Sequence, residues 1–318
     1  MQEQCDVLAA PGAAMMGNQE VMQESLFLPT SDGSAQLHVR HIYAANPGPA
    51  VLMVHGAIAN ARTFYSEKGK GLGPWLAARG FDVYIMDLRG RGASLPKLAR
   101  GARHGQTETI VDDIPLVLGD IARRRGDDVA VHCVGHSWGG VLISSTLARH
   151  PAWAKRVASC AYLATKRRIG VWNLRRIGTI ELFWSSLASA MCLVFGYLPA
   201  LRFGIGADDE SVKSLRQSQL WVRSRRWRDS DDGFDYAAAL ANGGLPPTLY
   251  LAGSKDPVLG HPEDVARFIQ ESGPHRHHLQ LLGTVAGLSR EYGHVDMLTH
   301  AAAESEVYPF VEAWLSNA

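Results

Sequence analysis

One serine stands in a sequence context that would make it a nucleophile. The run Gly135-His136-Ser137-Trp138-Gly139 fits the pattern G-x-S-x-G, between an apolar stretch (128–136) and a helical one (138–150). A serine on a sharp strand-to-helix turn is raised above the sheet, and small residues two positions away let strand and helix pack closely. We therefore predict that Ser137 is a nucleophile. The backbone N–H of Trp138, at the start of the helix, is predicted to stabilise an oxyanion.

A base and an acid in the right chain order support this prediction. A serine hydroxyl needs a base to remove its proton, and the base needs an orienting group. Asp256 follows the apolar run 247–253, and His294 lies between the last predicted strand (277–282) and the last helix. The loop after 156–164 reads TKRRIG and offers no carboxylate for the same role. We predict that His294 is the base and that Asp256 orients it.

A second oxyanion donor is expected in the loop after the third predicted strand. The run His55-Gly56-Ala57 lies at the end of that strand, 50–56. In a sheet of this order the loop lies beside the serine turn, so we assign the donor to the N–H of Ala57, with Ile58 as the alternative. His55 and Gly56 are interpreted as residues that shape the turn.

The remaining histidines and cysteines do not predict a metal site. His275, His277 and His278 lie together at the start of a strand, at the opposite edge of the sheet, without a carboxylate or cysteine at ligand spacing. The four cysteines are widely scattered, and three lie in apolar stretches: Cys5, Cys133, Cys160 and Cys192. We predict no metal, no cofactor and no disulfide framework. Reduced cysteines are typical of a reducing compartment, so we expect a cytoplasmic location.

Strand and helix patterns alternate along most of the chain. Short apolar runs are separated by segments of helical spacing, which is typical of an α/β fold with a doubly wound, mostly parallel sheet. Strands are expected at 25–30, 35–44, 50–56, 81–87, 128–136, 156–164, 247–253 and 277–282. The alternation of strand and helix patterns stops after the sixth predicted strand. We predict a core of residues 23–165 and 243–318, a helical cap at 166–242, and a loose N-terminal extension at 1–22.

The predicted cap contains an uncharged segment long enough to cross a membrane. Residues 182–201 carry no charged side chain. Three serines, a glycine and a proline, and the position in the middle of the chain, favour a lid or core segment, with membrane-surface contact left open. Its large apolar side chains either wall a substrate pocket or pack the cap on the sheet. The residues predicted to contact substrate are Ile58, Phe183, Trp184, Met191 and Phe195.

The charge balance of the chain bears on the kind of molecule that it binds. The chain has 318 residues, with 32 basic and 31 acidic side chains and a formal charge of +1. Such a balance does not indicate a nucleic-acid partner. We expect a small-molecule or lipid-like ester as the partner.

From about residue 25 onward, the chain resembles the α/β-hydrolase superfamily. Two stretches, GPWLAARGFDVYIMDLRGRGAS and YGHVDMLTHAAAESEVYPFVEAWL, resemble the acid-lipase and polyhydroxyalkanoate-synthase-like branch. The resemblance implies a serine hydrolase with the triad Ser137, Asp256 and His294 and the oxyanion hole at Ala57 and Trp138. Serine in place of cysteine at the nucleophile favours hydrolysis over polymerisation. An acyltransferase or thioesterase would show the same signature, and a non-catalytic binding protein is the remaining alternative.

Overall fold

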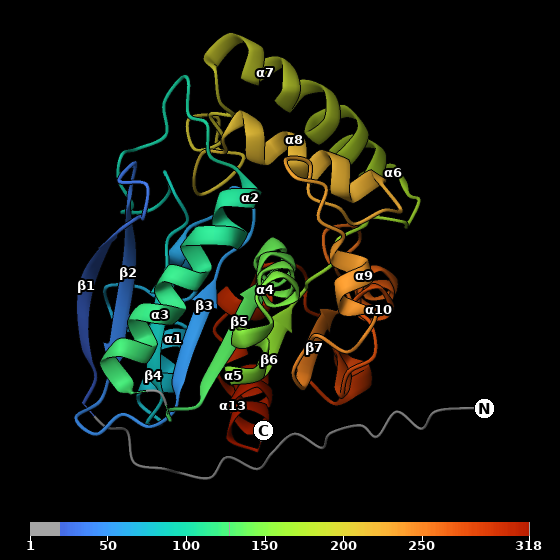
Figure 1. Ribbon diagram of the computed structural model, residues 1–318. Coiled ribbons are helices and arrows are strands. Elements are labelled where there is room, and N and C mark those ends of the chain that lie inside the picture. Colours follow the sequence, from blue (N-terminus) through green and yellow to red (C-terminus); the bar gives the residue numbers. More distant parts are fainter. Residues whose placement is uncertain (1–19, 127, 318) are drawn as a thin grey trace.

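A single mixed sheet organises the molecule. The computed structural model describes residues 20–126 and 128–317, and within them eight strands form one sheet in the order β1-β2-β4-β3-β5-β6-β7-β8 (Figure 1). β1, β2 and β4 pair antiparallel, and all other neighbours pair parallel. The strands are β1 (Met22–Pro29), β2 (Gln36–Tyr43), β3 (Ala50–Val54), β4 (Asp82–Met86), β5 (Val131–His136), β6 (Val157–Leu163), β7 (Thr248–Gly253) and β8 (His277–Leu282). The predicted α/β-hydrolase fold is confirmed.

The central strands are apolar on both faces because helices cover both sides of the sheet. Every residue of β3 and β4 is buried. Along β3, Leu52 and Val54 contribute to one hydrophobic cluster, whereas Val51 and Met53 contribute to the other. This alternation reflects the period of two along a strand, and it explains why the run lacks alternating polar residues.

Helices on the two faces complete the core. Residues of α3 and α4 belong to the first cluster, and residues of α1 and α13 belong to the second. The helices of the core are α1 (Leu72–Ala77), α2 (Gln106–Glu108), α3 (Ile114–Arg125), α4 (Trp138–Arg149), α5 (Pro151–Arg156), α10 (Pro262–Glu271), α11 (Asp296–Thr299), α12 (Ala303–Glu306) and α13 (Tyr308–Ser316), with a π-helical stretch at Thr109–Asp113 and single 3₁₀ turns at Ala61–Thr63 and Thr284–Ala286. The last helix predicted from the sequence is divided into α12 and α13, because Pro309 at the start of α13 lacks a backbone N–H.

Residues 166–242 contribute α6 (Leu174–Arg176), a π-helical stretch (Ile177–Leu187), α7 (Ala188–Phe195), α8 (Val212–Arg223) and α9 (Tyr236–Leu240). The helices from α6 to α8 lie at one end of the sheet (Figure 1), whereas α9 packs against α4. α8 lies over the start of α4, where the rings of Trp138 and Trp221 are 6.3 Å apart. The helices lie where the cap was expected, and the domain boundaries stay a prediction. Residues 1–19 of the expected extension lie outside the described part of the chain, and Met22 already belongs to β1.

One helix among the described residues could cross a membrane by length and composition. It runs without a break from Leu174 to Phe195, through α6, the π-helical stretch and α7, and only 17% of its apolar window is buried. One face of this helix nevertheless packs on protein, because Ala188 and Cys192 are buried in a small cluster with Leu215 of α8.

Candidate active site

Ser137 occupies a strained turn between β5 and α4. Its φ of 53° and ψ of −119° lie in a backbone region that residues other than glycine rarely adopt. The turn is held by a hydrogen bond from the Ser137 N–H to the Leu163 carbonyl of β6 (2.8 Å). The two motif glycines permit the close packing, since a Cβ on Gly139 would lie 2.0 Å from the Val54 carbonyl oxygen and one on Gly135 would meet Gly140 at 2.5 Å. The strand–turn–helix context expected for the motif is therefore present.

A chain of hydrogen bonds joins the three residues predicted as a triad. His294 Nε2 lies 3.0 Å from Ser137 Oγ, and His294 Nδ1 lies 2.6 Å from Asp256 Oδ2. The other oxygen of Asp256 accepts from the N–H groups of Val258 (3.2 Å) and Leu259 (2.9 Å). Both carboxylate oxygens are thus occupied, which holds the imidazole in one orientation. The geometry is that of a serine–base–acid relay.

The loop that carries His294 is tied to the end of β7, so the imidazole and Asp256 are placed together. The Lys255 N–H donates to the Tyr292 carbonyl (2.8 Å), and a Cβ on Gly253 would lie 2.4 Å from the same oxygen. Asp296 accepts from the Gly293 N–H (2.5 Å) and so helps to hold the same loop.

Burial sets the protonation of the relay. Burial lowers the pKa of His294, and its hydrogen bond with Asp256 offsets only part of that effect. Burial is the largest single effect on Asp256 and opposes its ionisation. The hydrogen bond from His294, the Val258 N–H and the charge of Lys166 together outweigh it and leave the pKa of the carboxyl below its usual value. The imidazole is therefore neutral and the carboxylate charged at neutral pH, which are the states that the predicted roles of base and orienting acid require.

A second histidine, His136, contacts the backbone of His294. His136 is buried, and its Nε2 lies 2.9 Å from the His294 carbonyl oxygen. Burial lowers the pKa of His136 to about 3, so that ring stays neutral. Its neutral Nε2–H donates to that carbonyl and helps to fix the backbone of His294.

The loop after β3 lies against the serine. A Cβ on Gly56 would be 3.0 Å from Ser137 Cβ, so only glycine allows this approach without a shift. His55 fixes the turn: its Nδ1 bonds the Gly56 carbonyl (2.9 Å), and its Nε2 accepts from the Leu88 N–H (3.2 Å). Burial lowers the pKa of His55 to about 4. The interpretation of His55 and Gly56 as residues that shape the turn agrees with these contacts.

Of the two backbone donors considered in this loop, one is already engaged. The Ile58 N–H donates to Glu210 Oε2 (3.2 Å), and Ile58 itself has a φ of 44°. Trp138 is the first residue of α4, where N–H groups have no intrahelical partner. Ala57 and Trp138 both line one cavity of about 20 Å³, room for roughly one water molecule. This arrangement favours Ala57 over Ile58 as the second donor.

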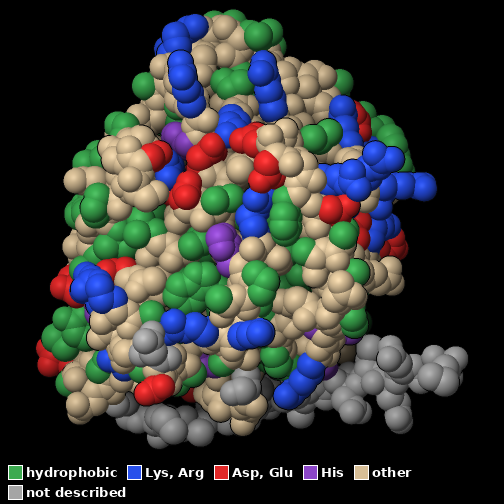
Figure 2. All heavy atoms as spheres, in the orientation of Figure 1, with side chains coloured by type: hydrophobic (Ala, Val, Ile, Leu, Met, Phe, Trp, Pro, Cys, Tyr) green, Lys and Arg blue, Asp and Glu red, His purple; other side chains and the backbone are tan. Residues whose placement is uncertain are grey.

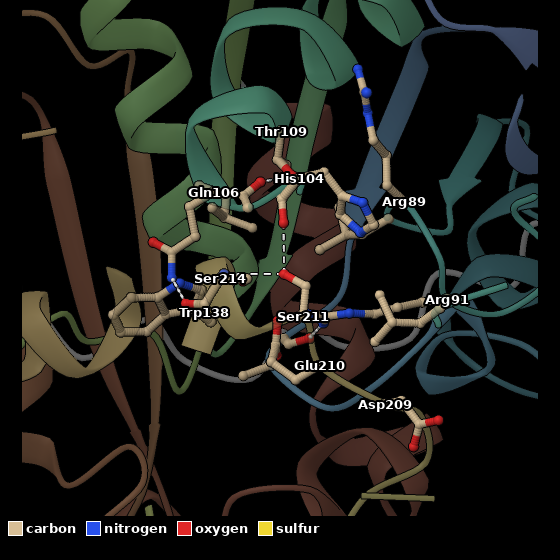
Figure 3. Close-up of a pocket in the computed structure, with 16 residues that line it drawn as sticks. Arg89, Arg91, His104, Gln106, Thr109, Trp138, Asp209, Glu210, Ser211 and Ser214 are labelled. Carbon is tan, nitrogen blue, oxygen red and sulfur yellow. Dashed lines mark hydrogen bonds and ion pairs between the residues drawn. The ribbon is translucent and has the colours of Figure 1, made fainter. Parts of the chain in front are cut away.

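Two buried charged residues that the sequence analysis did not single out hold the same loop (Figure 3). Arg91 forms an ion pair with Glu210, and its Nη1 donates to the Gly56 carbonyl (3.1 Å). Glu210 comes from residues 166–242, so it joins the cap segment to the turn beside Ser137. The run Asp208-Asp209-Glu210 has no spacing signal that distinguishes its third acid, and only tertiary contacts identify it.

Lys166 is another buried charge near the relay. Its Nζ lies 5.9 Å from the centre of the Trp138 ring. Burial lowers its pKa to about 8, although the negative charge of Asp256 works in the opposite direction. The lysine in turn contributes to the lowered pKa of His294.

The five residues predicted to contact substrate do not form one wall. Ile58, Trp184 and Met191 pack against the cluster that contains Ala188 and Leu215. The ring of Phe183 is tilted against that of Trp184, with centres 6.4 Å apart. Phe195 instead packs on Phe203 at the far end of the helix, with Arg202 over its ring. A role in substrate binding stays a prediction for all five.

Comparisons with known proteins agree with the fold. A model of the family described as serine aminopeptidase, S33, matches residues 45–285. No sequence among the curated proteins matches the chain.

Three solved structures that are similar to this chain are hydrolases. Naproxen esterase from Bacillus subtilis has a TM-score of 0.54 and 19% identity, over 94% of this chain and 92% of that one. The enol-lactonase from Burkholderia xenovorans LB400 has a TM-score of 0.55 and 18% identity, over 92% and 100%. The 2-hydroxy-6-oxo-6-phenylhexa-2,4-dienoate hydrolase from Rhodococcus sp. strain RHA1 has a TM-score of 0.56 and 19% identity, over 93% and 99%. At these identities the likeness supports the fold.

Proposed function

The chain belongs to the serine aminopeptidase S33 family of α/β hydrolases, and on that premise we propose that it is a serine hydrolase that cleaves carboxylic esters. The observation that carries the proposal is the continuous relay from Ser137 Oγ through His294 to Asp256, with distances of 3.0 and 2.6 Å. Both lie within the reach needed for proton transfer along a hydrogen bond.

The reaction proceeds through an acyl-enzyme. His294 Nε2 takes the proton from Ser137 Oγ as that oxygen attacks the ester carbonyl. The tetrahedral oxyanion accepts hydrogen bonds from the N–H groups of Ala57 and Trp138. The C–O bond to the alcohol breaks as His294 returns the proton to the leaving oxygen. A water molecule, deprotonated by the same imidazole, then cleaves the acyl-enzyme and regenerates the serine.

We assign a hydrophobic, lipid-like acyl group to the substrate, because apolar side chains of the cap share a cluster with Ile58 of the oxyanion loop. These cap side chains are Trp184 and Met191. The narrower resemblance to the acid-lipase and polyhydroxyalkanoate-synthase-like branch, and a cytoplasmic location, stay predictions.

The decisive experiment is labelling by a fluorophosphonate probe combined with hydrolysis of a short p-nitrophenyl ester. Ser137→Ala should abolish labelling and lower turnover by a factor on the order of 10⁴ or more. Ser305→Ala, a serine on an exposed surface, is the matched control and should behave as wild type. Labelling that persists in Ser137→Ala at the wild-type rate would exclude the assignment.

The same assay separates the alternatives that share this relay. Adding an alcohol or amine acceptor would divert the acyl group in an acyltransferase, and a thioester or an anilide would be preferred by a thioesterase or a peptidase. We expect the ester to be cleaved fastest and water to be the acceptor. A non-catalytic binding protein would give neither labelling nor turnover.

A further inference from the structure

The helix Leu174–Phe195 exposes an apolar stripe. Large side chains that face solvent recur at helical spacing, from Leu182 and Leu187 to Leu193 and Val194, and Leu193 is 76% exposed. Ser186 and Ala190, also exposed, lie between them. The stripe extends beyond the helix at both ends, and we call the whole surface the cap patch: Trp172, Leu174, Leu182, Leu187, Leu193, Val194, Leu201 and Phe203. Contiguous exposed apolar surface of this kind marks an interaction site.

The opposite side of the helix is anchored to the protein by polar contacts. The Gln219 amide of α8 donates to Ser189 Oγ (3.0 Å), and Glu181 forms an ion pair with Arg223 of α8. A membrane-spanning position would separate these groups from their partners inside hydrocarbon, where no water could replace the lost hydrogen bonds. The helix is therefore arranged to lie along an apolar phase rather than across it.

Basic side chains stand at the ends of the stripe. Arg175 lies at the first turn and is exposed. At the other end, the Arg202 guanidinium lies over the rings of Phe195 and Phe203, and Arg100 donates to the Val194 carbonyl. Figure 2 shows blue Lys and Arg side chains beside green hydrophobic ones at this end of the molecule.

The acidic residues nearby are neutralised or engaged. Glu181 is shared by two arginines. Asp208 and Asp209 accept hydrogen bonds from the N–H groups of Gly92 (2.5 Å) and Leu201 (3.0 Å). Residues 166–242 together carry twelve Lys or Arg and eight Asp or Glu. The cap segment thus presents an apolar stripe with positive ends.

We propose that the cap patch docks on the surface of an anionic phospholipid bilayer, with the helix Leu174–Phe195 parallel to the membrane plane. The leucine side chains enter the boundary between headgroups and acyl chains, and the arginines at both ends contact lipid phosphates. Charge complementarity selects this occupant, because an uncharged stripe with basic ends fits an anionic interface. The docking goes beyond the proposed ester hydrolysis and does not require it.

The test is sedimentation of the full chain with phosphatidylcholine vesicles that contain about one third phosphatidylglycerol, compared with pure phosphatidylcholine. Wild-type protein should bind the anionic vesicles about tenfold more tightly, and high salt should release it. Leu187→Asp/Leu193→Asp should weaken binding at least about tenfold, and Arg202→Ala about fivefold. Val285→Asp is the control, because Val285 is equally exposed (77%) outside the cap. Circular dichroism and short-ester turnover should be unchanged in these variants.

Four outcomes would overturn the proposal. The first is no sedimentation of the wild type with anionic vesicles, and the second is equal binding by the double aspartate variant. The third is binding that resists both salt and alkaline carbonate, which would indicate a spanning helix. The fourth is self-association of the wild type, lost in the double variant, without vesicle binding, which would assign the patch to a second copy of the chain. Because vesicle binding is measured without substrate, it can fail while Ser137 still hydrolyses esters, and the reverse.

Discussion

The Glu210 carboxylate accepts a hydrogen bond from the Ile58 N–H at 3.2 Å, although 152 positions separate the two residues. The same carboxylate pairs with Arg91, which also bonds the Gly56 carbonyl. The Ile58 carbonyl in turn accepts from the N–H groups of Ala207 (2.9 Å) and Asp208 (3.1 Å). The cap segment is therefore joined directly to the loop that is proposed to supply an oxyanion donor, and the position of one depends on the other.

Removing the charge of Glu210 should reduce both stability and turnover. Glu210→Gln leaves Arg91 as a buried guanidinium without its carboxylate, and such a loss costs about 3 kcal/mol. We expect that decrease in the free energy of unfolding, measured with urea, and a fall in kcat of about tenfold as the Ala57 donor shifts.

A double variant separates the two effects. Arg91→Met/Glu210→Leu removes both charges and should recover most of the stability. The loop still lacks its hydrogen bonds, so kcat should stay low. If kcat returned together with stability, the pair would have a purely structural role.

The pH dependence of kcat/KM should follow the neutral form of His294. Burial lowers the pKa of this imidazole below its ordinary value of 6.5. Since the protonated form cannot accept the serine proton, kcat/KM should rise with pH along a single limb whose midpoint lies below 6.5, and then stay level to about pH 8. Initial rates with a short ester across buffers of constant ionic strength check this. A midpoint above 7 would contradict it.

Asp256→Asn should impair the chemistry more than the fold. The amide can still accept from the Val258 and Leu259 N–H groups, but it can donate to His294 Nδ1 and favour the wrong tautomer. We expect kcat to fall by a factor on the order of 10⁴. The carboxylate raises the pKa of His294, so any residual activity should show an acid limb at still lower pH. Glu304→Gln, on an exposed surface, should leave turnover unchanged.

Two glycine variants should act in opposite directions on stability. In Gly139→Ala the new Cβ would lie 2.0 Å from the Val54 carbonyl oxygen, so β3 and α4 must separate. We expect a loss of about 3 kcal/mol in the free energy of unfolding. Gly119 lies inside α3 with nothing within 4 Å of its virtual Cβ, so Gly119→Ala should stabilise by about 1 kcal/mol. Thermal unfolding of both variants against wild type tests the pair.

Much of the molecule could be predicted from local patterns. The buried strands are recognisable because a strand covered on both faces must be apolar throughout, as in β3 and β4. The residues of the relay could be named because the turn at Ser137 needs small neighbours and because Asp256 and His294 follow strands at the carboxyl edge of the sheet. Helix boundaries were less accurate where proline interrupts, as between α12 and α13.

The sequence by itself determined the α/β core and the three residues of the candidate relay, since period, glycine placement and chain order can all be read from the order of residues alone. Only the tertiary structure decided which groups surround the relay. Glu210, Arg91, Lys166 and His136 matter because distant segments bring them into a buried region where charges and hydrogen bonds interact strongly. The exposed stripe of the cap was decided in the same way: an uncharged run fits a core, a lid or a membrane surface, and only packing shows which of its faces stays uncovered.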